Sequence, residues 1–495
     1  MRSPFVLCVS ILAVAVASPL FAKGVTEADL RGHIAVLASD EFEGRAPGTE
    51  GETKTIKYIA DSWKAVGLKP AAKDGSWYDP VALISRNVGA SKFAFAAGAR
   101  TLRVASDDIV LIGKAAQYTN KSVPILFGGY GVKSDGQVIA NVAGKMVLIF
   151  LDAPDFAPGD KQSPRARRDA LVEAGAEAVI LVAGSPGSWA AARRQLLSSP
   201  ISLESQDKRA ALEGAISSEF AVALITAAGQ DWDKLRQVAK ADDFAGEPLN
   251  VNGSFYVTTN VRRFNSQNVV GKLPGKKKSA GAVMYMGHWD HLGICGDEDS
   301  ADRICNGAVD NASGIAVLNE VAEALAKKRH DRDIYFVATT GEESGLLGAY
   351  AFADSPPLPL DQLLVSFNVD MTAVAPRGAK VVIIGRGTTK LDSAVETVAR
   401  KAGRGIERSS EANAFLQRQD GWALSQKGVP ALMIGGSFAD LALIQKFLDS
   451  DYHGPDDELT DSTELGGAVE DANLHVALGQ HFADGRKFKR IKASE

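Results

Sequence analysis

Apolar residues recur at two different spacings along this chain, and these spacings predict where its parts begin and end. Leu30, Ile34 and Leu37 lie one helical turn apart behind Thr26, which predicts a helix with Thr26 as its N-cap. The same spacing predicts a second helix over residues 56–63. Residues 23–80 therefore look like the opening of a larger domain that resumes further along the chain.

Between residues 81 and 253 the pattern changes to short apolar runs that are separated by turns. Strands are predicted over residues 109–112, 123–127, 146–151, 178–182 and 221–225, with one helix over 163–175. This region contains no histidine, and no cluster of candidate metal ligands falls in it. We therefore predict that residues 81–253 form an inserted domain for recognition or gating. The alternative is that they belong to one continuous core.

From residue 254 to 495 buried strands alternate with helices, which is the pattern of an α/β fold. A helix is predicted over residues 312–330, and apolar strands over 282–287, 334–340 and 363–369. Each of these strands leads directly into a candidate metal ligand.

Five features that could bind metal lie in this last part of the chain. They are His288, Glu342 with Glu343, and Asp370 after the three strands, Asp310 in the turn-rich stretch 306–314, and His453 in the stretch 451–456. Open parallel sheets bind ligands just beyond the carboxyl ends of their strands. Neutral imidazole with carboxylates suits zinc, and zinc sites that keep an open position are catalytic. The pattern therefore indicates a metallohydrolase.

Each feature alone has a simpler interpretation, and only the five features together are strong evidence for a metal site. Asp310 or Asn311 alone would be taken as a helix N-cap. Two adjacent carboxylates behind a buried strand suggest one metal ligand and one general base. Asp290 can support His288 and fix its tautomer, whereas His291 is expected to point elsewhere and to be structural.

The N-terminus has the layout of a secretory signal. Arg2 precedes an apolar stretch over residues 5–17 and small residues up to Ala22. We predict removal of residues 1–22 and a periplasmic or secreted protein without stable membrane insertion, against the alternative of a retained anchor. Cys295 and Cys305 then remain as a pair on one loop, which predicts a disulfide. Thiolate ligation of metal is the weaker alternative. A net charge of −5 without a basic cluster gives no support for nucleic-acid binding.

At this point the chain resembles the co-catalytic di-zinc exopeptidases of the aminopeptidase Y type, whose relatives include glutamate carboxypeptidase and glutaminyl cyclase. The stretches that carry the resemblance are 287–293, 309–314, 341–348, 368–371 and 452–457. Residues 38–45 are similar to bacterial members, and stretches 127–131 and 144–148 resemble a protease-associated domain. The chain departs from the family pattern at Gly454, where members often have Thr, and at 419–421, where Gln-Asp-Gly replaces Ser-Asp-His. Side-chain specificity is therefore not carried over.

The resemblance implies an αβα sandwich around a mixed, mostly parallel sheet, with an inserted β-rich protease-associated domain. It also implies two zinc ions and roles for particular residues: Asp310 bridging both ions, His288 and Asp370 completing one, Glu343 and His453 the other, Glu342 as the base, Asp290 supporting His288, and Tyr452 polarising the substrate carbonyl. The implied function is an aminopeptidase that hydrolyses N-terminal residues of peptides through a zinc-bound water. The alternatives are a carboxypeptidase or dipeptidase on the same centre, and less plausibly a cyclase or a non-catalytic receptor-like binding module.

Overall fold

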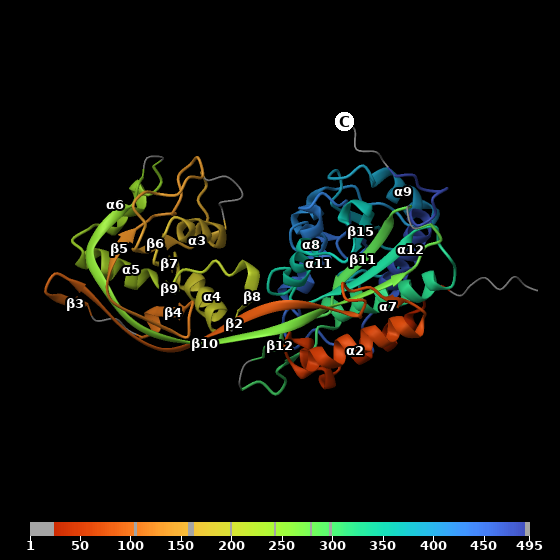
Figure 1. Cartoon of the computed structure of the whole chain (residues 1–495), viewed down its shortest axis with the longest axis horizontal. Helices are drawn as coiled ribbons and strands as arrows, with labels where there is room; N and C mark the ends of the chain where they lie inside the picture. Colours follow the sequence, from red (N-terminus) through yellow and green to blue (C-terminus); the bar gives the residue numbers. More distant parts are fainter. Residues whose placement is uncertain are drawn as a thin grey trace, which may run out of the picture.

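The computed structural model describes residues 24–102, 106–156, 163–198, 200–241, 244–277, 280–296 and 299–490. Two lobes are visible, joined by a pair of long strands, β2 (Tyr78–Ala97) and β10 (Glu247–Leu273) (Figure 1). We call the part between these strands, with their adjoining halves, the small lobe. The rest is the large lobe. The predicted signal segment 1–22 lies outside the described residues.

The large lobe is built on a mixed, mostly parallel sheet, as predicted. Its strand order is β16-β17-β15-β11-β14-β10. The four central strands, β17, β15, β11 and β14, are parallel to one another, and the two outer strands, β16 and β10, are antiparallel to them. The strands are β11 (Ala282–His288), β14 (Asp333–Thr339), β15 (Leu363–Asn368), β16 (Val382–Ile384) and β17 (Ala431–Gly435).

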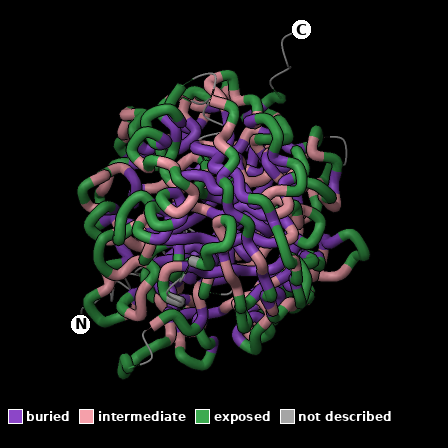
Figure 2. The backbone as a smooth tube through the Cα atoms, turned by 90° about the vertical axis from the view of Figure 1, so that its left-hand side faces the viewer, coloured by how far each residue is buried: buried purple, intermediate pink, exposed green. Residues whose placement is uncertain are grey.

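Side-chain alternation along the sheet creates two buried faces. On β11, Val283 and Tyr285 enter one apolar core, while Met284 and Met286 enter the core on the opposite face. The first face is covered by α1 (Glu27–Leu37), α2 (Glu50–Ala65), α7 (Gly314–Ala326), α9 (Asp392–Lys401) and α12 (Gly466–Phe482), and the second by α8 (Leu347–Asp354) and α10 (Gly421–Ser425). The result is the expected αβα sandwich. Seen from the side of the small lobe, the backbone is largely buried in the interior of the molecule and exposed around its outside (Figure 2).

In the small lobe the same sheet continues from β10 through mostly parallel strands. These strands are β5 (Gln117–Phe127), β6 (Met146–Phe150), β7 (Ala178–Val182) and β9 (Leu212–Ile216), with β4 (Ile109–Gly113) antiparallel at the edge. Its helices are α3 (Pro164–Glu173), α4 (Pro186–Leu197), α5 (Ser218–Ala227) and α6 (Trp232–Val238). Four of the five predicted strands and the predicted helix are confirmed. With four helices, the lobe is more helical than the β-rich domain that the resemblance implied.

The strand predicted over residues 221–225 is wrong, because these residues form the middle of α5. The Ser217 side chain accepts a hydrogen bond from the backbone N–H of Phe220 and so caps a helix that begins before the apolar run. Phe220, Ala221 and Leu224 are buried together, which is helical rather than alternating spacing. Elsewhere, Thr26 caps α1 as predicted, and α7 is shorter than residues 312–330.

The predicted limits of the inserted domain, residues 81 and 253, fall inside β2 and β10 rather than in loops. These two strands pair antiparallel from Tyr78 with Val269 as far as Ala96 with Asn252. The division into domains therefore stays a prediction, because one ribbon runs through both lobes. Within the described part of the chain, no helix combines the length and apolar character needed to cross a membrane.

Candidate metal centre

The predicted ligands meet at the carboxyl edge of the large-lobe sheet. β11 ends at His288, Glu343 follows the end of β14, and Asp370 follows the end of β15. Since β11 pairs in parallel with both β14 and β15, the three strand ends lie side by side. Asp310 reaches the same place from the turn (Ala308–Ser313) that precedes α7, and His453 from the turn after α11 (Leu441–Asp449).

The first group consists of His288, Asp310 and Asp370, all buried. His288 Nε2 lies 3.2 Å from Asp310 Oδ1 and 3.3 Å from Asp370 Oδ1. One potential ligand atom from each of the three residues lies within 4.8 Å of the others. Two carboxylate oxygens and one imidazole nitrogen at this separation form a donor set that could hold a cation.

The second group gathers around the other oxygen of Asp310. His453 Nε2 lies 3.4 Å from Asp310 Oδ2 and 2.7 Å from Glu343 Oε2. Asp310 therefore turns one carboxylate oxygen toward each group, which is the arrangement expected of a carboxylate shared by two cations. All five predicted ligands come together at one place.

His291 also lies in the centre, so the expectation that it points elsewhere is wrong. Its Nδ1 is 2.6 Å from Glu343 Oε1, and with Asp310 and Glu343 it forms a second trio that could hold a cation. His291 lies three residues past the end of β11. The alternation of side chains between the two faces of a strand therefore does not determine where it points.

Asp290 contacts His288 differently from the prediction. The nitrogen Nδ1 of His288 lies 3.1 Å from the backbone carbonyl oxygen of Asp290, while the Asp290 carboxylate is 3.9 Å away. The carboxylate instead accepts a hydrogen bond of 3.1 Å from the backbone N–H of Glu342. Asp290 thus fixes the imidazole through its main chain and the turn after β14 through its side chain.

Glu342 and Tyr452 line a small pocket beside the first group. The pocket is also lined by His288, Asp310 and Asp370, and its apolar wall comes from Met371, Phe415, Met433, Phe438 and Leu448. The ring of Tyr452 stacks on the ring of His453 with centroids 3.7 Å apart. Gln419 and the exposed Arg418 complete the lining, which places the sequence departure at 419–421 beside the centre.

The electrostatics of the centre favour positive charge between its carboxylates. Burial lowers the pKa of His453, but the carboxylates of Asp310 and Glu343 outweigh it and raise this pKa to about 10. Burial alone would raise the pKa of Asp310, yet hydrogen bonds from His288 and His453 lower it far below its usual range. Burial, together with Glu343 and Asp370, raises the pKa of Glu342 well above that of a free carboxyl group. The ionised carboxylates thus stabilise positive charge between them, and such a donor set suits divalent cations.

Arg45 is a residue of the centre whose role the sequence did not reveal. Its guanidinium is fully buried and donates hydrogen bonds to the carbonyl oxygens of Leu37, Trp289, Asn306 and Gly307, at 2.7, 2.9, 2.5 and 3.0 Å. Trp289 lies on the segment that carries His288 and His291, while Asn306 and Gly307 lead into Asp310. Arg45 therefore ties the two ligand-bearing segments together. In the sequence, the stretch 38–45 shows only a similarity to bacterial family members.

Asp457 and Asn311 fix the same segments through side-chain hydrogen bonds. The two oxygens of Asp457 accept from the backbone N–H groups of Val309 and Asp310, at 2.8 and 3.0 Å. The Asn311 amide donates to the carbonyl oxygens of His288 and Val369, at 3.3 and 3.2 Å. Asn311 also accepts from the N–H of Gly314, as the predicted N-cap would, so the simpler interpretation holds for Asn311 while Asp310 faces the centre.

Cys295 and Cys305 form the predicted disulfide, with Cα atoms 5.8 Å apart. They flank a small hairpin of β12 (Gly293–Ile294) and β13 (Ile304–Cys305). Cys295 Sγ lies 3.6 Å from the carbonyl oxygen of His453. The cross-linked loop thus packs against the segment that carries His453.

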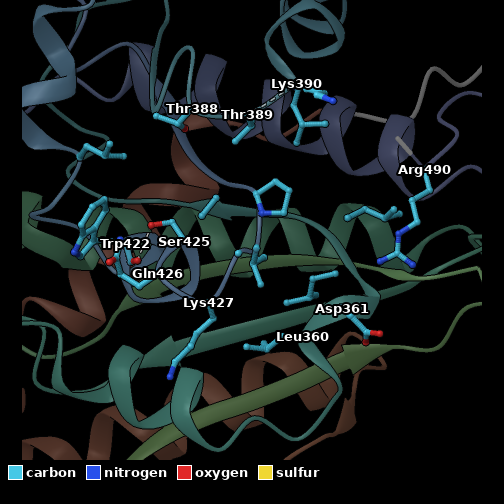
Figure 3. Close-up of a pocket in the computed structure, with 18 of the residues that line it drawn as sticks. Leu360, Asp361, Thr388, Thr389, Lys390, Trp422, Ser425, Gln426, Lys427 and Arg490 are labelled. Carbon is cyan, nitrogen blue, oxygen red and sulfur yellow. Dashed lines mark hydrogen bonds between the residues drawn. The ribbon is translucent and has the colours of Figure 1, made fainter. Parts of the chain in front are cut away.

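A larger cavity, of about 800 Å³, lies at the opposite edge of the sheet, where β15 and β17 begin (Figure 3). Lys390, Lys427 and Arg490 lie around it, and Asp361 is the one candidate metal ligand among the described residues that line it. A lone carboxylate does not make a metal site. The candidate centre is therefore the ligand cluster at the carboxyl edge.

Comparison with known proteins agrees with this geometry. Residues 268–476 match the model of peptidase family M28. Aminopeptidase YwaD of Bacillus subtilis is 33% identical over 112 residues, which are 22% of each chain. A protein of Pyrenophora teres f. teres named "Probable zinc metalloprotease" is 35% identical over 107 residues, 22% of this chain and 23% of its own. The matched stretch thus spans about a fifth of the length of these curated relatives.

Among solved structures, an aminopeptidase from Aneurinibacillus sp. strain AM-1 aligns with 92% of this chain and 94% of its own. The TM-score is 0.56 at 18% sequence identity, which establishes a shared fold. Fold and site together define an α/β protein with a candidate metal centre at the carboxyl edge of its sheet. The match of residues 268–476 to the model of peptidase family M28 confirms the predicted resemblance to zinc exopeptidases.

Proposed function

We propose that this protein is a zinc-dependent exopeptidase that holds two zinc ions and removes N-terminal residues from peptides. The observation that carries the proposal is the position of Asp310, whose two oxygens face His288 with Asp370 on one side and His453 with Glu343 on the other. A carboxylate in this position can hold two cations about 3.5–4 Å apart.

In this proposal His288, Asp310 and Asp370 hold one ion, and Asp310, Glu343 and His453 hold the other. His453 is preferred to His291 as a ligand because it contacts both carboxylates of its group. His291, which contacts Glu343 alone among them, then orients that carboxylate.

Zinc in such a centre acts as a Lewis acid and lowers the pKa of water. Glu342 lines the pocket beside the first group, while its neighbour Glu343 faces the second group. Glu342 is therefore free to accept the proton of the attacking water and return it to the leaving amine. Its backbone N–H is held by Asp290, which keeps the turn in place. Tyr452 lines the same pocket, where its hydroxyl can donate to the substrate carbonyl.

The apolar wall of this pocket supports an exopeptidase that accepts a terminal residue with an apolar side chain. Met371, Phe415, Met433 and Phe438 would surround such a side chain next to the scissile bond. One observation favours a carboxypeptidase or dipeptidase instead: Arg418 lines the same pocket and could bind a terminal carboxylate. An aminopeptidase and a carboxypeptidase can be distinguished with peptides that are blocked at the N-terminus or at the C-terminus.

The test combines metal analysis with a substrate panel. We expect about two zinc ions per chain, and hydrolysis of leucyl-nitroanilide and of C-terminally amidated peptides, but none of N-acetylated peptides. Asp310→Asn should lower occupancy at both sites, whereas the same change at the exposed Asp361, on the far cavity, should alter neither metal content nor rate. Hydrolysis of acetylated but not amidated peptides would establish the carboxypeptidase, and full zinc content in Asp310→Asn would refute the shared carboxylate.

A further inference from the structure

The metal centre lies between two differently lined cavities. The apolar pocket of Met371 and Phe438 lies on the side of β15 and β17. On the other side, beyond β14, a cavity of about 420 Å³ opens between α3, α4 and the small-lobe sheet. Its lining includes Ser344, the residue directly after the candidate ligand Glu343, and Arg165 from α3. The second cavity therefore connects the small lobe with the metal-binding turn.

Arg165 is the small-lobe cation that lies against this turn. Its guanidinium nitrogen Nη1 would lie 3.9 Å from a Cβ atom on Gly345. Gly345 is two residues beyond Glu343, a span of at most about 7 Å of extended backbone. The guanidinium is thus close enough to the centre to meet the far end of a very short peptide whose first peptide bond lies over the ions.

Arg165 has no acidic partner within the described part of the chain, and the group on which its charge acts there is the hydroxyl of Tyr350. Other cations of the same cavity are paired: Arg168 with Asp169, Arg209 with Glu213, and Lys208 with Glu173. Arg165, by contrast, has neither an ion pair nor a side-chain hydrogen bond to any described residue, and it is exposed. A guanidinium that is free, planar and accessible is suited to bind a carboxylate with two parallel hydrogen bonds.

Two sets of contacts hold α3, the helix that carries Arg165, in this position. Arg167, two residues along α3, is fully buried and donates to the carbonyl oxygens of Tyr130, Phe150, Leu151 and Asp152, which anchors α3 to the end of β6. The small lobe in turn packs on the large lobe through an apolar cluster in which Leu203 of β8 (Ile201–Leu203) meets Leu347, the first residue of α8. The spacing between α3 and the metal-binding turn is therefore set by packing.

We propose that Arg165 binds the C-terminal carboxylate of di- and tripeptides, so that the small lobe selects short peptides with a free C-terminus. The proposal rests on the proposed aminopeptidase function and adds the substrate class. The substrate lies across the centre, with its N-terminal side chain in the apolar pocket and its carboxylate at the second cavity. Longer or amidated peptides lack a carboxylate at this distance and are hydrolysed less well.

The experiment compares the zinc-loaded full-length enzyme and its variants on Leu-Ala-Ala, on the same tripeptide as its C-terminal amide, and on leucyl-nitroanilide. The measured quantity is kcat/KM for the acid divided by kcat/KM for the amide. We expect this ratio to be about tenfold to a hundredfold in the wild type, the effect of a charge-assisted hydrogen bond, and close to one in Arg165→Gln. The ratio should fall at high salt. The matched control Arg193→Gln, an exposed arginine of α4, should retain it.

Equal rates for acid and amide in the wild type, or a ratio that survives in Arg165→Gln, would overturn the proposal while leaving the aminopeptidase function intact. A ratio lost in Arg418→Gln but kept in Arg165→Gln would overturn it as well, because the carboxylate would then lie in the apolar pocket. If the zinc-loaded wild type hydrolyses none of the three substrates, the proposed function itself has failed.

Discussion

Replacing Arg45 should damage the metal centre from a distance. Its guanidinium makes four hydrogen bonds to backbone carbonyl oxygens, three of them on segments that carry His288 or Asp310. No carboxylate of a described residue lies within ion-pair distance of it; Asp457, Asp310, Asp290 and Glu343 act on its charge from further away. Arg45→Met keeps much of the side-chain volume but leaves the four carbonyl groups without a donor.

The cost follows from two opposing terms. Each hydrogen bond from a charged donor contributes about 1.5–3 kcal/mol, so four would contribute roughly 6–12 kcal/mol if they were additive. Burying the guanidinium costs several kcal/mol, and the same burial lowers the pKa of Arg45 to about 10. We expect a net loss of about 3–5 kcal/mol of unfolding free energy in Arg45→Met. Arg45→Lys keeps the charge but cannot reach all four carbonyls, so a smaller loss of about 2 kcal/mol is expected.

The assay is urea unfolding of the metal-free and zinc-loaded proteins, together with a chelator competition that gives the zinc affinity. Because Arg45 joins the two ligand-bearing segments, the loss should be accompanied by weaker zinc binding, even where the protein is still folded. A matched control is Arg167→Met in the small lobe. Arg167 also donates hydrogen bonds to four backbone carbonyl oxygens, so its loss should lower stability without changing zinc affinity. Unchanged zinc affinity in folded Arg45→Met would refute the positioning role.

Three further outcomes are expected. Glu342→Gln should keep the fold and both zinc ions but lower kcat by about 10²–10⁴-fold, which steady-state rates and metal analysis on one preparation will check. Burial lowers the pKa of His475 to about 4, so the fold is fully stable with respect to this group above pH 6.5, where the imidazole is neutral in both states. About 3 kcal/mol of unfolding free energy should be lost as the pH falls from 6.5 to 4. Urea unfolding of His475→Gln should show a smaller loss of unfolding free energy over this pH range. Replacing Cys295 and Cys305 by Ser should lower the unfolding free energy by about 2–3 kcal/mol, measured against the oxidised wild type, and an unchanged midpoint would contradict this.

The sequence was sufficient to predict the large-lobe sheet and the ligand set because both depend on local pattern. Each of the three buried strands is six or seven residues long and has a ligand at its end, as at His288, or within four residues of it. Predicting the strands therefore also located the site. Asp310 was identified only through the set, because its local signal is that of a helix cap. The geometry then separated it from Asn311, which does cap.

What could not be predicted depends on contacts between residues far apart in the chain. Arg45 is 244 residues from its partner Trp289, and nothing in its local sequence distinguishes a buried arginine from an exposed one. The same holds for Asp457, which is 147 residues from Asp310. The strand wrongly predicted over 221–225 is a different case: a short apolar run fits either period, and only the cap at Ser217 decides for a helix.

The paired strands β2 and β10 also bear on how such a chain can gain or lose a lobe. Where they leave the large lobe they are antiparallel neighbours, with Leu83 opposite Phe264 and Val81 opposite Ser266. A tight turn of two residues could therefore join them at that point, and the large-lobe sheet would keep every strand. In its topology, the small lobe is thus an insertion between the two strands of a β-hairpin. Because the chain enters and leaves the small lobe on neighbouring strands, the pairing within the large-lobe sheet does not depend on the size of the segment between them.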